Sequence, residues 1–531
     1  MAQSYFTGLF GNEQNMMITT LEYISPSVSD EDNSNLLALF QISEFKKALF
    51  SMHNDKSPDP DGLNPAFYKR FWRLCRMELF HAGVTWLQNG NFPTQVTYTN
   101  IVLIPKKDNP ESMRDLRPIS LCNVIYKVIS KVLANRLKPF LSKCISQEQS
   151  AFVGGRSITD NVMVAYEIVH HMKCKRKGKM GEVALKIDIS KAYDRVDWNY
   201  VKSVMRRMGF HDKWVEWMSM CMESVNYQVL VNGERVGPIT PKRGLRQGDP
   251  LSPYLFIICA EGLSALLKKS EASGDIHGVK VCRGAPILTH LLFVDDCFLF
   301  CRANLSENTK LKEILQIYEA VSGQAINFQK SEIFFSTNTS EADREVVKEV
   351  LQVSEGLENG RYLSLPSMVG RNKKAIFGYL RDRVWNRIQQ WSGKQLSKAG
   401  RDVLIKSVAQ TIPTYCMSTF LLPTSLGEEI QKMINSFWWG TNRRQGRGMH
   451  WFSWDKLTMR KEYGCMGFRH FFGFNLAMIG KQGWKLQTEP HTIVTRIYKA
   501  KYFPTTDFLG AHLGHNPSFI WRSIFASQVL V

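Results

Sequence analysis

Two short acidic segments, about a hundred residues apart, carry the side chains best suited to chemistry. Asp188 ends the apolar run 183–187, and Asp295 and Asp296 follow the apolar run 291–294. Mg²⁺ prefers hard oxygen ligands and keeps several waters, so a few aspartates and substrate phosphates can hold two ions. Two such ions can stabilise both the attacking and the leaving oxygen of an in-line displacement at phosphorus. The residues therefore predict a two-cation phosphoryl-transfer site.

Strands must position these acids. The run 183–187 alternates as a strand does, and 291–293 and 297–300 would form a hairpin with Asp295 and Asp296 at its tip. Adjacent aspartates among apolar residues repel each other, and a bound cation relieves the repulsion. An exposed Asp-Asp turn without function is the alternative, and for this pair alone it is the commoner case. The loop 244–253, Gly-Leu-Arg-Gln-Gly-Asp-Pro-Leu-Ser-Pro, lies between the acidic segments and favours the functional interpretation.

The positive charge of the chain is unevenly distributed. The formal net charge is +20, and residues 361–462 alone hold 18 Lys and Arg against 6 Asp and Glu. Eight of the 13 Trp lie beyond residue 384. Cations interleaved with aromatic rings suit a surface that follows a phosphate backbone and stacks on bases. A solvated helical face is the alternative explanation of the charge.

Composition excludes several classes of protein. A chain of 531 residues with 44% hydrophobic residues can bury a large core and suggests about two to four lobes. No apolar stretch approaches the roughly 20 residues that span a bilayer, and residues 1–6 are no secretory signal. The 11 Cys are scattered singly, which argues against disulfides or structural zinc. We expect an intracellular protein without a membrane partner.

The predicted secondary structure is a mixture of helices and strands. It predicts a strand at 100–105, a helix at 125–141, a β-hairpin around Asn232-Gly233, and a buried helix from Ser252 as N-cap to about Lys268. Because helices and strands do not alternate regularly, the expected class is α+β. After residue 365 the pattern becomes mainly helical and basic.

A series of motifs in order extends over nearly the whole chain and resembles the LINE-type (non-LTR) retrotransposon reverse transcriptases, especially those of plants. Besides the acidic segments and the 244–253 loop, they are Ile-Pro-Lys-Lys (104–107), Leu-Arg-Pro-Ile-Ser-Leu (116–121), Glu-Gln-Ser-Ala-Phe-Val-Gly-Gly-Arg-Ser-Ile-Thr-Asp-Asn (148–161), Ser-Gly-Gln-Ala-Ile-Asn-Phe-Gln-Lys-Ser (322–331), Tyr-Leu-Ser-Leu-Pro (362–366), Phe-Trp-Trp-Gly (437–440) and Gly-Cys-Met-Gly-Phe (464–468).

The resemblance implies a right-hand polymerase, with an antiparallel fingers and palm sheet among helices. The expected divisions are an N-terminal helical extension and fingers base at 1–95, fingers and palm at 96–365, a basic helical thumb at 366–460, and a truncated helical C-terminal extension at 461–531.

It also implies roles for the acids. Asp188 and Asp295, with Asp296 beside them, would be the catalytic residues and the ligands of Mg²⁺, with Mn²⁺ a possible substitute. Lys330 matches the lysine suspected of protonating the departing pyrophosphate, although a lysine at the end of a loop needs no function.

Five further residues match positions that hold the incoming dNTP in this family. Lys106 and Arg117 would bind the triphosphate, and each alone is also an ordinary surface cation. Tyr193 would occupy the space of a ribose 2′-OH, or else be a core tyrosine. Gln247 and Gly248 would lie under the nucleotide, where glycine lets backbone approach the base pair, or form a plain helix-entry loop.

Three positions depart from the family pattern. Val294 replaces the usual alanine before the paired aspartates, where a β-branched residue suits a strand. Asp59 and Ser364 each replace a glycine. If either glycine has positive φ, its replacement costs on the order of 1 kcal/mol.

The resemblance implies an RNA-directed DNA polymerase whose partners are an RNA template, a DNA primer and dNTPs. The alternatives are a catalytically silent relic that still binds nucleic acid and, less well matched, an intron maturase-like splicing cofactor. No endonuclease is expected within this chain, and the family suggests a nuclear location.

Overall fold

A five-stranded sheet forms the centre of the protein in a computed structural model that describes residues 2–11, 20–55, 61–356, 360–392, 394–440 and 449–531. The strand order is β11-β10-β3-β8-β7, and only β10 and β11 pair in parallel. Both faces of the sheet are buried, with Val183 and Leu185 on one face and Ala184 and Phe298 on the other. The strands are β3 (Glu182–Ile187), β7 (His290–Phe293), β8 (Asp296–Arg302), β10 (Glu332–Phe335) and β11 (Ser354–Glu355).

A second sheet stands beside the first, with strand order β2-β1-β5-β6. Its strands are β1 (Tyr98–Pro105), β2 (Leu116–Cys122), β5 (Asn226–Val231) and β6 (Glu234–Ile239). Asn232 and Gly233 join β5 to β6 with φ of 52° and 88°, which confirms the predicted hairpin. The strand predicted at 100–105 is β1.

One apolar core joins the inner face of the central sheet to the surrounding helices, while β1, β5 and β6 of the second sheet pack in a separate small core with Phe6 and Phe10. The long α12 is buried because it is apolar on most sides. The helices of this region are α1 (Ala2–Leu9), α2 (Asp30–Leu36), α3 (Ile42–Phe50), α4 (Pro65–Arg70), α5 (Trp72–Asn89), α6 (Thr94–Thr97), α7 (Val124–Leu137), α8 (Leu141–Cys144), α10 (Trp198–Arg207), α11 (Asp212–Glu223), α12 (Ser252–Ala272), α13 (Leu305–Ser322) and α14 (Glu341–Leu351).

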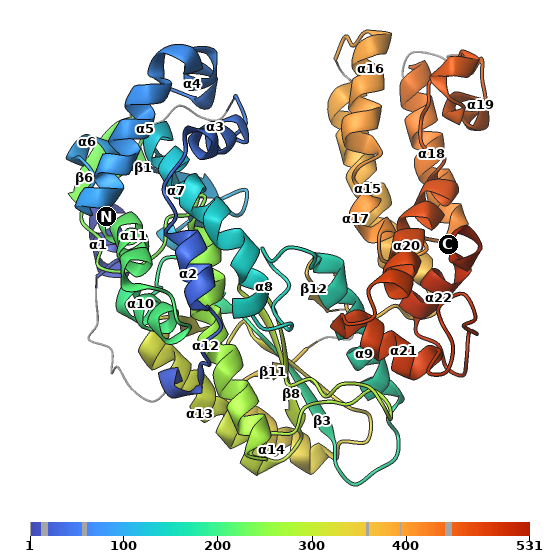
Figure 1. The fold of residues 1–531 in the computed structure, drawn as a ribbon. Coiled ribbons are helices and arrows are strands. Elements are labelled where there is room, and N and C mark those ends of the chain that lie inside the picture. The colour runs from blue at the N-terminus through green and yellow to red at the C-terminus, as the bar shows by residue number, and fades with distance from the viewer. Residues whose placement is uncertain (1, 12–19, 56–60, 357–359, 393, 441–448) are drawn as a thin grey trace.

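A second apolar core lies on the outer face of the central sheet and continues into the C-terminal helices. Figure 1 shows α15, α16 and α18 rising as an arm opposite the lobe that carries α3–α5. We call α15–α18 (residues 373–439) the arm. The helices of this half are α9 (Ile158–Cys174), α15 (Lys373–Ser392), α16 (Lys398–Leu404), α17 (Thr414–Met417), α18 (Thr424–Trp439), α19 (Trp454–Thr458), α20 (Phe471–Thr488), α21 (Ile493–Tyr502) and α22 (Phe519–Ala526).

Two helix predictions need adjustment, although the α+β class is confirmed. The helix expected at 125–141 is α7, which ends at Leu137 and passes into a short 3₁₀ turn, Lys138–Phe140. The assignment of Ser252 as N-cap is wrong, because Ser252 is already helical and Leu251 is the N-cap. The Asp249 side chain accepts the Leu251 N–H at 2.9 Å and so holds the turn before the helix.

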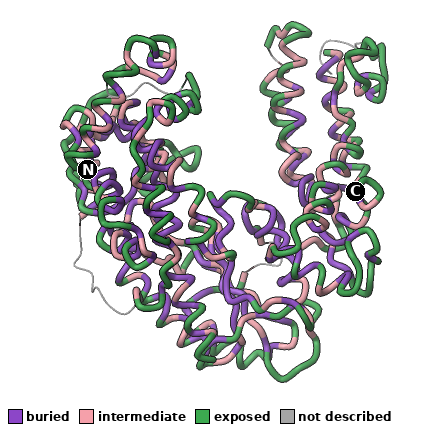
Figure 2. The backbone as a smooth tube through the Cα atoms, in the orientation of Figure 1, coloured by how far each residue is buried: buried purple, intermediate pink, exposed green. Residues whose placement is uncertain are grey.

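Buried residues concentrate along the central strands and the helices that cover them, while the outward helix faces are exposed (Figure 2). None of the helices in the described part of the chain combines the length and apolar character needed to cross a bilayer.

Candidate active site

The three predicted acids meet at one end of the central sheet. β3 and β8 pair antiparallel up to Ile187 opposite Cys297, so Asp188 and Asp296 lie just beyond that pair on adjacent strands. Asp295 is the neighbouring turn residue of the β7–β8 hairpin. Residues far apart in the sequence therefore form one acidic cluster, Asp188, Asp295 and Asp296.

Burial and mutual repulsion make the acidic cluster unfavourable without a counter-charge. Burial, and then the charges of Asp295 and Asp188, raise the pKa of Asp296 to about 6. The pKa of Asp295 is also raised, chiefly by burial and further by Asp188, while Arg117 opposes the shift. A cation bound here would relieve both the desolvation and the repulsion.

The turn that carries Asp295 has a strained backbone. Val294 has φ of 58°, a conformation that β-branched residues rarely adopt. Its N–H donates to Oε1 of Gln149 at 3.3 Å, and Gln149 is almost fully buried. The expectation that valine suits this position because it lies in a strand is wrong: β7 ends at Phe293, and Val294 belongs to the turn.

Tyr193 lies beside the acidic cluster. Its ring stacks on Phe256 of α12, with centroids 4.7 Å apart and an interplanar angle of 10°. Burial raises the pKa of Tyr193, and the charge of Asp295 raises it further. The backbone oxygen of Tyr193 accepts the N–H of Leu245 at 2.7 Å, so the 244–250 loop fixes this segment.

Lys106 and Arg117, the predicted triphosphate ligands, lie in a basic cluster with Lys191 and Lys330. Partial desolvation lowers the pKa of Lys106, and the charges of Lys191, Arg117 and Lys330 lower it further. Lys106 and Arg117 stand at the end of the β1–β2 pair where the 106–115 loop joins the two strands, and both side chains are exposed. Arg117 is also close enough to Asp295 to affect its pKa. The basic cluster therefore borders the acidic one.

Sequence reasoning missed Lys191 and Asp194, although both lie in the segment that supplied Asp188 and Tyr193. Asp194 is 6% exposed, and burial raises its pKa to about 6 although Lys191, Lys106 and Arg195 oppose the shift. It is thus a buried acid beneath the basic cluster. The short Lys-Ala-Tyr-Asp sequence was the only available signal, because burial depends on distant residues.

Gln247 and Gly248 lie against the second sheet. The carbonyl of Gln247 accepts the Ser120 N–H at 2.8 Å. Gly248 has φ of +126°, and a Cβ there would meet Ser120 O at 2.8 Å. Glycine is required here because a side chain would collide with the backbone of β2.

A buried ion pair between Arg246 and Asp249 stabilises the same loop. Arg246 is 3% exposed, its Nε lies 3.9 Å from Oδ2 of Asp249, and its guanidinium lies 4.0 Å from the Tyr126 ring centroid. The Tyr126 hydroxyl donates to Asp249 at 2.7 Å. Arg246 stands inside a predicted motif, yet its local sequence gives no sign that it is buried.

The second departure from the family pattern is strained, as expected for a replaced glycine. Leu363 and Ser364 form a two-residue turn between β12 (Arg361–Tyr362) and β13 (Leu365–Pro366), with φ of 47° and 66°. Turns with positive φ at both positions favour Asn-Gly. Asp59, the third departure, lies outside the described residues.

Within the described ranges, no three His, Cys, Asp or Glu side chains are gathered tightly enough to hold a metal ion by themselves. A metal at the acidic cluster would therefore share its coordination with substrate and water oxygens, as Mg²⁺ commonly does. The carboxylates are hard oxygen donors and fit such an ion.

Comparison with known proteins identifies the family that this chain resembles. The family model described as reverse transcriptase (RNA-dependent DNA polymerase) matches residues 104–371, just over half of the chain. The chain is 27% identical over 450 residues to the transposon TX1 uncharacterized 149 kDa protein of Xenopus laevis, covering 83% of this chain and 33% of that protein.

Two further relatives match shorter parts. The chain is 26% identical over 274 residues to the retrovirus-related Pol polyprotein from type-2 retrotransposable element R2DM of Drosophila melanogaster, covering 52% of this chain and 24% of the polyprotein. It is 34% identical over 121 residues to an uncharacterized mitochondrial protein of Arabidopsis thaliana, covering 23% of this chain and 78% of that protein. The chain spans a third or less of the two retroelement proteins. Because the family match includes the strands that carry all three acids, this chain belongs to the reverse transcriptase family, with non-LTR, LINE-type retroelement proteins among its relatives.

Proposed function

We propose that this chain is the RNA-directed DNA polymerase of a LINE-type retroelement, which extends a DNA 3′-OH on an RNA template and releases pyrophosphate. The adjacent acidic and basic clusters support the proposal best. Polymerisation needs carboxylates for divalent cations and fixed positive charge for a triphosphate at one site. Both lie at the same end of the central sheet, beside Tyr193.

In this proposal, Asp188, Asp295 and Asp296 hold Mg²⁺, for which Mn²⁺ is a possible substitute. Bound cations would supply the charge that makes the 3′-hydroxyl reactive and neutralises the phosphate oxygens. The raised pKa values of Asp295 and Asp296 support this role, since binding a cation offsets what their burial costs.

The basic cluster binds and orients the incoming dNTP. Lys106 and Arg117 contact the triphosphate, Lys191 adds charge from beneath, and Lys330 donates a proton to the leaving pyrophosphate. Tyr193, fixed by its stacking on Phe256, excludes a ribose 2′-OH. The loop around Gln247 and Gly248 supports the templating pair from its place against β2.

The divisions 1–95, 96–365, 366–460 and 461–531 are part of the proposal, with the arm as the thumb that holds the primer–template. Its contacts would be to phosphates and sugars, because a polymerase must not select sequence. RNA template, DNA primer and dNTPs are the partners it requires, and we propose a nuclear location.

A catalytically silent relic that retains nucleic-acid binding is the second candidate. Two observations favour it: the left-handed backbone at Val294, directly before Asp295, and the left-handed Ser364 where the family pattern has glycine. At each of these positions the residue is larger than the one in the family pattern, and at positive φ the larger side chain adds strain.

Primer extension separates the two candidates. The purified chain with poly(rA)/oligo(dT), Mg²⁺ and dTTP should extend the primer, and Asp295→Asn should abolish extension without weakening template binding. Asp275→Asn, an exposed acid on the loop after α12, is the matched control and should extend normally. Template binding without extension, at every protein concentration, would select the relic.

A further inference from the structure

Helix α20 contacts the arm and the central region of the fold at the same time. We propose that α20, anchored by the ion pair between Lys485 and Asp160, sets the position of the arm relative to the central sheet and thereby sustains processive synthesis. Lys485 and Asp160 are in this view positioning residues. The inference rests on the proposed polymerase function, and it assigns residues 471–488 to the polymerase unit itself.

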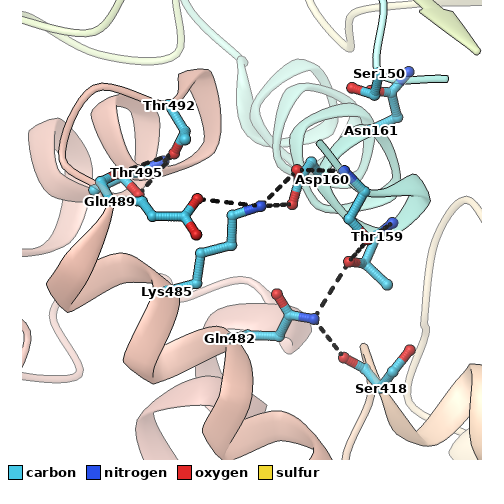
Figure 3. Close-up of polar contacts among 11 residues, drawn as sticks. Ser150, Thr159, Asp160, Asn161, Ser418, Gln482, Lys485, Glu489, Thr492 and Thr495 are labelled. Carbon is cyan, nitrogen blue, oxygen red and sulfur yellow. Dashed lines mark hydrogen bonds and ion pairs between the residues drawn. The ribbon is translucent and has the colours of Figure 1, made fainter. Parts of the chain in front are cut away.

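The anchor to the central region is a nearly buried ion pair. Lys485 Nζ lies 2.9 and 2.7 Å from the two carboxylate oxygens of Asp160, and the side chains are 14% and 12% exposed (Figure 3). Asp160 also accepts the N–H of Ser157 at 2.9 Å, in the first turn of α9. The lysine therefore binds a carboxylate that the fold already holds in place.

The anchor to the arm comes from the same helix. Asn475, which is 2% exposed, accepts the Leu422 N–H at 2.8 Å. Its amide nitrogen donates to the carbonyl oxygens of Met417 at 2.8 Å and Phe420 at 2.9 Å. These contacts fix α20 to the segment between α17 and α18, at the base of the arm.

Gln482 joins the two anchors. Its amide nitrogen lies 3.3 Å from Thr159 Oγ1 of α9 and 3.3 Å from Ser418 O at the base of the arm (Figure 3). Asn475, Gln482 and Lys485 are seven and then three residues apart, a spacing that places them on one helical face. One face of α20 thus contacts both α9 and the base of the arm.

α9 continues this path to the catalytic hairpin. Asn161, next to Asp160, donates to the carbonyl oxygen of Leu292 in β7 at 2.7 Å. Leu292 is three residues before Asp295. The helix turn that Lys485 binds is therefore the one that also contacts the strand carrying the acidic cluster.

The surrounding packing joins α9, α20 and the arm into one body, so that the position of α20 on α9 is transmitted to the arm. One apolar core includes residues of α9, the arm and α20–α22, so the arm has no core of its own. A second ion pair, Lys501 Nζ to Glu167 Oε1 at 2.5 Å, fixes α21 to α9 one helix further along. Removing one partner of a buried pair destabilises that contact more than removing a surface pair would. Lys485 also lies 3.6 Å from the half-exposed Glu489, so Lys485→Met, which leaves the buried Asp160 without its cation, should have a larger effect than Asp160→Asn.

Four variants test the proposal. Lys485→Met removes the charge but keeps most of the chain length. Asp160→Asn removes the opposite charge while keeping an oxygen for the Ser157 N–H. Lys481→Met is the matched control, because Lys481 is exposed on the same helix. Lys485→Arg should keep the arm in the position that it has in the unmodified chain, because a guanidinium can also bind the carboxylate.

Two measurements are needed. The first, which requires no activity, is the distance distribution between site-specific labels at the exposed Glu78 of α5 and Arg387 of α15. It should broaden in Lys485→Met and Asp160→Asn and match the unmodified chain in Lys481→Met. The second is primer extension with a trap for dissociated enzyme, compared with the rate of a single dTTP addition. Product length per binding event should fall several-fold in the two anchor variants, with the single-addition rate nearly unchanged.

An unchanged distance distribution in folded Lys485→Met would overturn the proposal, whatever the activity. A broadened distribution with full-length processive products would overturn the role in processivity. If the unmodified chain binds template but never extends, the proposed function fails instead, and the distance measurement still decides whether α20 sets the arm.

Discussion

The side-chain oxygen of Gln149 accepts a hydrogen bond from the backbone N–H of Val294 at 3.3 Å, directly before Asp295. This contact supports a turn residue whose φ of 58° is costly for valine. Val294→Gly should therefore raise the free energy of unfolding by about 1 kcal/mol, because glycine adopts positive φ without strain. Urea unfolding followed by circular dichroism measures the change.

Val346→Gly is the control for that experiment, since Val346 lies in the middle of α14. There, glycine should lower stability by about 1 kcal/mol, because it is a poor helix former. A loss of stability of the same size in Val294→Gly would show that the hairpin turn is not left-handed.

The raised pKa of Asp296, about 6, predicts a pH dependence for the metal-free protein. A carboxyl whose pKa is higher in the folded than in the unfolded state binds its proton more tightly when folded. Its contribution to stability is therefore complete below its unfolded pKa of about 3.9 and is lost as the pH rises through about 6. Asp296→Asn has no ionisable carboxyl at this position and therefore does not show this loss of stability as the pH rises.

In EDTA, Asp296→Asn should be more stable than the unmodified chain near neutral pH, by on the order of 1–2 kcal/mol, with little difference near the unfolded pKa. Urea titrations at both pH values check this. Saturating Mg²⁺ should reduce the difference, because the unmodified carboxylate then has a counter-charge. A variant that is less stable than the unmodified chain at neutral pH would contradict the repulsion described for the acidic cluster.

The turn between β12 and β13 predicts a stabilising substitution outside the acidic cluster. Ser364→Gly should raise the melting temperature and add about 1 kcal/mol, since φ at Ser364 is 66°. The double change Leu363→Asn with Ser364→Gly should add more, because both turn positions have positive φ. Ser354→Gly, in the exposed strand β11, should give no gain and so serves as the control. Equal effects at positions 354 and 364 would argue against a left-handed Ser364.

The acidic cluster could be predicted because its signal is local. Alternation in the strand before Asp188 and two apolar runs around Asp295 suffice to specify strand ends, and antiparallel pairing then brings them together. The contributions of Lys191 and Asp194 to the charge of the site could not be predicted in the same way. Whether a charged residue in a turn is buried depends on which distant elements cover it, and nothing within a few residues encodes that.

Polar contacts between residues far apart in the sequence could not be predicted either. Gln149 supports a hairpin 145 residues away, and Lys485 binds Asp160 across 325 residues. Gln149 and Asp160 both lie within a motif of the family, but no neighbouring residue predicts their partners, and the pattern of residues 461–531 predicts only a helical extension. The divisions at 95, 365 and 460 stay predictions, and the apolar core shared by α9, the arm and α20 runs across the last two.

Tyr193 predicts how the site selects its sugar. Its ring is fixed by stacking on Phe256 at 4.7 Å, and we expect this fixed ring, rather than the hydroxyl, to exclude a ribose 2′-OH. Tyr193→Ala should raise rATP incorporation relative to dATP on a poly(rU) template by at least tenfold, a difference of about 1.4 kcal/mol in the transition state. Tyr193→Phe keeps the ring and should keep the discrimination. Phe256→Ala should relax it partly, since the ring then loses its support. Measuring kcat/KM for both nucleotides in each variant tests the assignment, and unchanged discrimination in Tyr193→Ala would remove this residue as the determinant of sugar choice.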